Sequence, residues 1–163
     1  LAAALVAAAV VVAIALVVPR LLTGSAPAVQ ADYPHYASTA ELEGVADLIV
    51  RGTFTSITPD DSAGYPRVIA TVDVTAAAKG PVEPGTTLEI AYTSGGAGER
   101  TDLEVGGEYV LLLDDLADLE GDWPPTPVNA FQGFYTVVDG RAVAGPDNAV
   151  PLSPATLGAL GLS

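Results

Sequence analysis

The densest group of side chains that could do chemistry is a run of carboxylates in the second half of the chain. It contains Asp114, Asp115, Asp118, Glu120 and Asp122. Oxygen ligands at Asp118, Glu120 and Asp122 are of the type that Ca²⁺ prefers. The EF-hand pattern fails, because Trp123 replaces the turn glycine and no Glu closes the loop. We interpret the run as a solvated acidic loop; the alternatives are a weak calcium site and a hydrolase that uses these carboxylates.

Other candidates for nucleophilic or acid–base chemistry are few. His35 is the single histidine, and it lies in a predicted linker, where a base would lack the fixed geometry that catalysis requires. Ser94 is not in a nucleophile elbow, because Tyr92 stands where the first glycine should be. The glycines after Ser94 meet neither dinucleotide-binding nor P-loop spacing. The sequence therefore indicates a protein with no catalytic residue and no cofactor.

Trp123, the only tryptophan, opens the stiff segment Trp-Pro-Pro-Thr-Pro. An aromatic side chain held on such a segment can anchor a partner; the alternative is a lid whose tryptophan packs on its own domain. Ser94 and Arg100 lie in a glycine-rich loop, and loops commonly form a binding rim. We take Trp123, Ser94 and Arg100 as partner-binding candidates.

Charge and composition exclude several classes of partner. The 163 residues carry a formal net charge of −14, and after Ala31 there are 20 acidic residues against five scattered basic ones. Nucleic acid and anionic membrane surfaces are both bound through clusters of Lys and Arg, so neither is an expected partner. The absence of cysteine excludes disulfides, thiolate zinc sites and cysteine nucleophiles.

Residues 1–22 are expected to insert in a membrane. Leu1 to Val18 are apolar without exception and would form about 27 Å of helix, close to the thickness of the hydrocarbon core. We favour a single-pass anchor in the cell membrane with the domain outside, joined by a linker at 23–38; the alternative is a signal peptide cleaved after Ala31. We expect the basic leader that would set the orientation to precede Leu1.

Residues 39–163 are predicted to form one mainly β domain. Ser38 and Glu41 make a capping box for a short helix from Thr39 to Ala46. Alternating apolar residues then predict half-buried strands in three runs, and a fully apolar run predicts a strand covered on both faces. Two further runs flank Asp139-Gly140, a two-residue hairpin signal. These runs are 48–55, 67–74, 87–92, 109–113, 133–138 and 141–144.

Turn residues separate these five or six antiparallel strands, at Pro59-Asp60-Asp61, Gly80-Pro81, Pro84-Gly85 and Gly106-Gly107. Short strands at such spacing favour a small closed barrel, with a β-sandwich as the alternative.

The strings that carry a family resemblance are 46–53, Lys79-Gly80, 84–88 and 105–113. Together they resemble uncharacterised exported proteins of actinobacterial envelopes. Their strand and turn order is also similar to the OB-like barrel of the netrin and tissue-inhibitor-of-metalloproteinase modules, over about residues 46–138. The resemblance implies an OB-like barrel fold and transfers no functional residue. The inhibitor branch uses an N-terminal cysteine that this chain lacks, so protease inhibition by that means does not carry over.

The leading hypothesis is a non-catalytic, membrane-tethered envelope domain that binds another envelope protein or a cell-wall component. Its binding loops would lie near 94–102 and 115–130. A carboxylate- or calcium-dependent hydrolase of the envelope and a structural stalk without a ligand are the alternatives.

Overall fold

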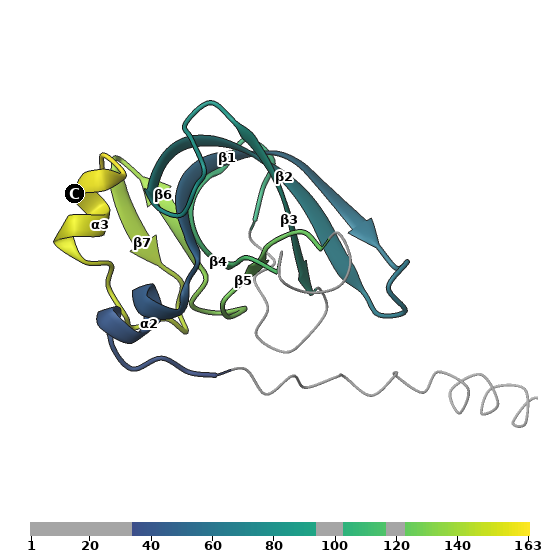
Figure 1. The fold of residues 1–163 in the computed structure, drawn as a ribbon, viewed down its shortest axis with the longest axis horizontal. Helices are drawn as coiled ribbons and strands as arrows, with labels where there is room; N and C mark the ends of the chain where they lie inside the picture. The colour runs from purple at the N-terminus through teal and green to yellow at the C-terminus, as the bar shows by residue number, and fades with distance from the viewer. Residues whose placement is uncertain (1–33, 94–102, 117–122) are drawn as a thin grey trace, which may run out of the picture.

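The computed structural model describes residues 34–93, 103–116 and 123–163, which fold into two short helices and seven strands (Figure 1). In chain order the elements are α2 (Thr39–Val45), β1 (Leu48–Asp60), β2 (Arg67–Lys79), β3 (Thr87–Thr93), β4 (Glu108–Asp114), β5 (Thr126–Pro127), β6 (Phe134–Val138), β7 (Arg141–Ala144) and α3 (Pro154–Ala159).

The seven described strands form a single open antiparallel sheet. Its order is β3-β2-β1-β4-β6-β7, and β5 pairs with β4. The predicted mainly β fold is therefore confirmed, and the predicted runs correspond to β1, β2, β3, β4, β6 and β7. The predicted position of the turn at Pro59-Asp60-Asp61 is wrong. Pro59 and Asp60 still pair with Val68 and Arg67, so the turn begins only after Asp60.

The long strands β1 and β2 are bent by irregular pairing. Their register shifts between Ile49 and Val50, between Arg51 and Gly52, and between Phe54 and Ser56. Such bulges increase the local twist and let a long strand curve over a core. At Gly52 the strands approach so closely that a Cβ atom would lie 2.5 Å from Val72 Cγ1 and 2.7 Å from the carbonyl oxygen of Asp73. Glycine is therefore required at this bulge.

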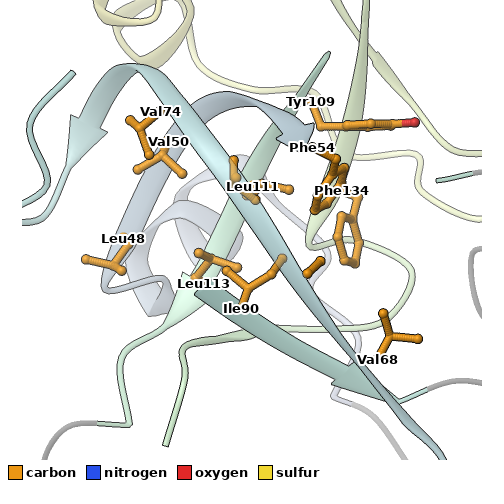
Figure 2. Close-up of a cluster of buried hydrophobic side chains, with 12 residues drawn as sticks. Leu48, Val50, Phe54, Val68, Val74, Ile90, Tyr109, Leu111, Leu113 and Phe134 are labelled. Carbon is orange, nitrogen blue, oxygen red and sulfur yellow. The ribbon is translucent and has the colours of Figure 1, made fainter. Parts of the chain in front are cut away.

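Strand β4 is covered on both faces, as its fully apolar sequence predicts. Tyr109 and Leu111 point into one core, which the curved sheet encloses and in which Phe54, Tyr109 and Phe134 lie together (Figure 2). Val110 and Leu112 point into a second core on the opposite face. The side chains of Leu111 and Leu112 are both fully buried. Because one strand supplies both cores, the two faces of the sheet are stabilised together.

The second core is closed by the two helices and the C-terminal segment. Leu42 of α2 packs there with Leu152, Leu160 and Leu162. The predicted helix start at Ser38 is confirmed: Ser38 Oγ accepts a hydrogen bond from the Glu41 backbone N–H (3.3 Å). The return bond to Glu41 Oε2 comes from the N–H of Ala37, at 3.0 Å. Helix α3 was not predicted.

Side chains join α2 to its neighbours. Glu43 accepts hydrogen bonds from the backbone N–H (2.7 Å) and hydroxyl (2.9 Å) of Ser153, the N-cap residue of α3. Lys79, at the end of β2, donates from Nζ to the carbonyl oxygens of Glu43 and Gly44 at 3.0 and 3.1 Å. The two bonds from Lys79 satisfy backbone carbonyl groups in the last turn of α2, which the end of a helix leaves without partners.

The segment that leads into α2 is held by two buried amide side chains. Gln132, fully buried, accepts from the N–H of Tyr36 through Oε1 and donates to its carbonyl oxygen through Nε2, each at 2.9 Å. Asn129 Nδ2 donates to the carbonyl oxygen of Pro34. Asn129 Oδ1 accepts from the N–H groups of Phe131 (2.7 Å) and Gln132 (3.2 Å), which fixes the loop between β5 and β6. We call these two side chains the amide clamp.

Of the two helices in the described residues, neither α2 nor α3 has the length and hydropathy to cross a bilayer. The predicted anchor at 1–22 lies outside the residues that the structure describes.

Candidate ligand-binding pocket

A pocket of about 230 Å³ lies beside β3 and β5. β3 is an edge strand, β5 pairs with β4, and the Ala91 N–H of β3 donates to the Pro125 carbonyl oxygen, just before β5, at 3.0 Å. The described residues that line the pocket are Tyr65, Arg67, Ala91, Tyr92, Thr93, Leu116, Trp123, Pro124, Thr126, Pro127, Ala130 and Phe134. They come from three parts of the chain that are far apart in sequence, namely 65–67, 91–93, and Leu116 with residues of 123–134, and the folded sheet brings these parts together.

Two aromatic rings connect the pocket to the core. Phe134, the first residue of β6, is buried, and the ring of Tyr92 meets it edge-on, with centroids 5.8 Å apart and an interplanar angle of 77°. Tyr92 pairs with Val68 of β2. Burial, and to a smaller degree the nearby Tyr109, raises the pKa of Tyr92 to about 12. The Tyr92 hydroxyl is protonated at neutral pH, as a phenol of ordinary pKa would be, and can act as a hydrogen-bond donor.

Two more aromatic side chains lie at the mouth of the pocket. Trp123 is 44% exposed and Tyr65, in the turn between β1 and β2, is 47% exposed. Large apolar side chains that stay this exposed beside a concave surface are typical of binding sites. Pro124 and Pro127 add rigid apolar walls next to Trp123.

One charged side chain, Arg67, lines the described part of the pocket, and it is paired. Its Nε lies 2.6 Å from Asp60 Oδ2, and its guanidinium carbon lies 6.0 Å from the centroid of the Trp123 ring. Hydrogen bonds from the Ser62 side chain and backbone N–H, followed by Arg67, lower the pKa of Asp60 to about 2. The Asp60 hydrogen bond in turn raises the pKa of Arg67. Both groups are charged at neutral pH, so the pair is close to neutral overall.

The chemistry of this lining suits binding. Of the described residues that line the pocket, none carries a carboxylate, imidazole or thiol. They supply aromatic and proline surface together with donors from a guanidinium, two phenols and two threonine hydroxyls. Such a lining recognises a largely apolar ligand and orients it through a few hydrogen bonds.

Of the partner-binding candidates, the structure places Trp123 at the mouth of this pocket. The other two, Ser94 and Arg100, and the calcium candidates Asp118, Glu120 and Asp122 lie outside the described residues. His35 is exposed.

Beside the calcium candidates, two acidic groups of the run are described. Burial, reinforced by Asp47, raises the pKa of Asp114. The N–H of Asp115 donates to Asp47 Oδ2 at 3.0 Å. Within 34–93, 103–116 and 123–163, no three His, Cys, Asp or Glu side chains gather as a metal site would require.

Sequence reasoning missed Tyr65, Arg67, Tyr92 and Phe134 as site residues. Tyr92 and Phe134 occupy inward positions of strands, where aromatic side chains usually form the core. Of these four residues, only Tyr65 has a sequence signal for a surface site, because it is an aromatic residue in a polar turn and precedes a proline.

Comparison of the chain with protein-family models, with curated proteins and with solved structures gave no match.

Proposed function

We propose that this chain is a non-catalytic binding domain whose ligand site is the pocket between Tyr65, Tyr92 and Trp123. The observation that carries the proposal is the half-exposed aromatic mouth over a buried aromatic floor. Apolar surface of this kind costs free energy in water and regains it when a ligand covers it. The lining supplies donors but, in its described part, no nucleophile with a base, which favours binding over turnover.

The proposed location is the cell envelope. Residues 1–22 would insert in the lipid bilayer and hold the domain outside the cell; cleavage after Ala31 would instead release it. The continuous apolar run from Leu1 to Val18 supports insertion. The surplus of acidic residues argues against nucleic acid as a partner. Another envelope protein or a cell-wall component is the proposed partner.

The proposed architecture is an OB-like barrel related to the netrin and tissue-inhibitor modules. The hydrogen bond from Ala91 of β3 to Pro125 supports it, because β5 follows directly and pairs with β4. The chain from 125 to 127 thus bridges β3 and β4, the two strands on either side of the β1–β2 pair. On this proposal the pocket lies at the seam of the barrel, and β6 and β7 extend the sheet beyond it.

Site-directed photo-cross-linking in intact cells tests the binding function. A photoreactive amino acid replaces Tyr65 at the pocket mouth in one variant and Val143 of β7 in the other; both positions are 47% exposed. We expect a discrete adduct from position 65 that is absent from position 143. The adduct should disappear when Trp123→Ala is added, because that change removes one wall of the mouth.

Equal labelling at both positions, or an adduct that survives Trp123→Ala, would show that the pocket is not the site. An assay of the protein against envelope polymers, with and without a calcium chelator, covers the hydrolase alternative. Chelator-sensitive turnover there would contradict the non-catalytic function.

A further inference from the structure

We propose that the ligand of this pocket is a proline-containing peptide segment flanked by basic residues. This inference rests on the binding function proposed above and names the class of ligand. It draws on three properties of the described residues: the shape and stiffness of the lining, its hydrogen-bonding character, and the charges around it.

The lining is made of flat, rigid surfaces. Tyr65, Tyr92 and Trp123 present aromatic rings, and Pro124 and Pro127 present proline rings. Aromatic grooves of this kind bind polyproline II segments, because proline rings lie flat against them and the peptide is already extended. Such a peptide loses little conformational entropy on binding, since its φ angles are fixed beforehand.

The polar groups of the lining are mainly donors. The guanidinium of Arg67 can only donate, and the phenol of Tyr92 can donate as well. A proline segment is the matching partner, because its carbonyl oxygens accept while its prolines have no N–H. An alkyl chain offers no acceptor at all and is therefore a poorer match for the polar part of the lining.

The charges beside the pocket favour a basic ligand. Asp61 opens the β1–β2 turn and follows Asp60, the last residue of β1 and the ion-pair partner of Arg67. Asp114 pairs with the lining residue Thr126, and Asp115 precedes the lining residue Leu116. Of the described basic residues only Arg67 lines the pocket, and Asp60 already neutralises it. An Arg or Lys on the peptide therefore meets a surplus of carboxylates, whereas an acidic flank is repelled.

Calorimetric titration of the 163-residue protein with matched peptides tests the inference. The protein is held in phospholipid nanodiscs, because detergent tails would compete for an apolar pocket. The first peptide has a central run of prolines with arginines at both ends. The second replaces the arginines with glutamates, and the third keeps the arginines but replaces the prolines with alanines.

We expect the first peptide to bind and the other two to bind at least about tenfold more weakly. Raised salt should weaken the binding of the first peptide, because its flanking arginines bind through charge pairs. Trp123→Ala and Tyr65→Ala should each lower its affinity about tenfold, whereas Val143→Ala on β7 should leave it unchanged. All three side chains are half-exposed, and circular dichroism checks that each variant keeps the fold.

Equal binding of the arginine and glutamate peptides would overturn the basic flank, and equal binding of the alanine peptide would overturn the proline segment. Failure of all three peptides, with a position-65 adduct still formed in cells, would overturn the ligand class and leave the binding function standing. Failure of the peptides together with absence of the adduct would overturn both.

Discussion

Gly52 has no room for a side chain, and this makes it a sensitive position for stability. We expect Gly52→Ala to destabilise the protein by about 1–3 kcal/mol, because the new methyl group would collide with Val72 and with backbone atoms of Asp73. Gly44→Ala in α2 is the matched control, since nothing lies within 4 Å of its Cβ position, and there alanine should be neutral or stabilising. Urea unfolding of the three proteins measures the difference. An equal effect of both substitutions would contradict the steric explanation.

Asp60 should make the stability depend on pH in acid. Its pKa in the folded protein is about 2, below the ordinary value of 3.8, so its contribution is fully present above about pH 4. The contribution is lost as the pH falls through 2. We therefore expect Asp60→Asn to lower the urea midpoint near pH 6 and to have a much smaller effect near pH 2.

The exposed Asp61 provides the control for that prediction, since Asp61→Asn removes one negative charge from the next residue of the chain. If the effect of Asp60→Asn were the same at both pH values, the ion pair with Arg67 would not be its cause.

At the scale of elements, Lys79 should stabilise α2 from the end of β2. Its ammonium group donates to two carbonyl oxygens in the last turn of the helix, where a positive charge also interacts favourably with the helix dipole. We expect Lys79→Met, which keeps most of the stem, to cost about 1 kcal/mol. Arg141→Met on the exposed edge of β7 is the control and should cost less. A thermal shift that is no larger for Lys79 than for Arg141 would contradict the cap.

The elements differ in how far the sequence predicts them. Strands such as β1 and β2 alternate apolar and polar residues, which predicts one buried face. Strand β4 is apolar in its central run, which predicts burial on both faces. Helix α3 has only six residues and contains Gly158, too short for an amphipathic pattern. Its one signal is Ser153-Pro154, a cap residue followed by a proline suited to the first turn. Strand β5 is two residues within a proline-rich stretch, and it pairs only because β4 lies beside it.

At the scale of the whole molecule, the pocket is less predictable than the fold. Trp123 could be nominated from sequence because it is a lone tryptophan beside prolines. Arg67 and Phe134 could not be nominated, because they line the same pocket only through the way in which the sheet places β2 relative to β6. Strand patterns report which face of a strand is buried, whereas a pocket depends on distances between strands that are far apart in sequence.

The amide clamp makes residues 34–38 part of the folded unit. We expect a fragment of residues 34–163 to be more stable than a fragment of residues 39–163, because the shorter one leaves Gln132 and Asn129 buried without their partners. Each such unpaired amide costs about 1–3 kcal/mol. Chemical denaturation of both fragments measures the difference. Replacing Gln132 with Leu should reduce it, since the leucine needs no hydrogen bond. Equal stabilities of the two fragments would contradict the clamp.

The same clamp determines where a mechanical load enters the domain. A pull on the chain before Pro34 reaches Asn129 and Gln132 through three hydrogen bonds before it reaches α2 or β1. The loop that carries these two residues also carries Ala130, which lines the pocket. Tension on the N-terminal segment is therefore transmitted to the wall of the pocket, and a domain tethered there would bear the load first at the proposed binding site.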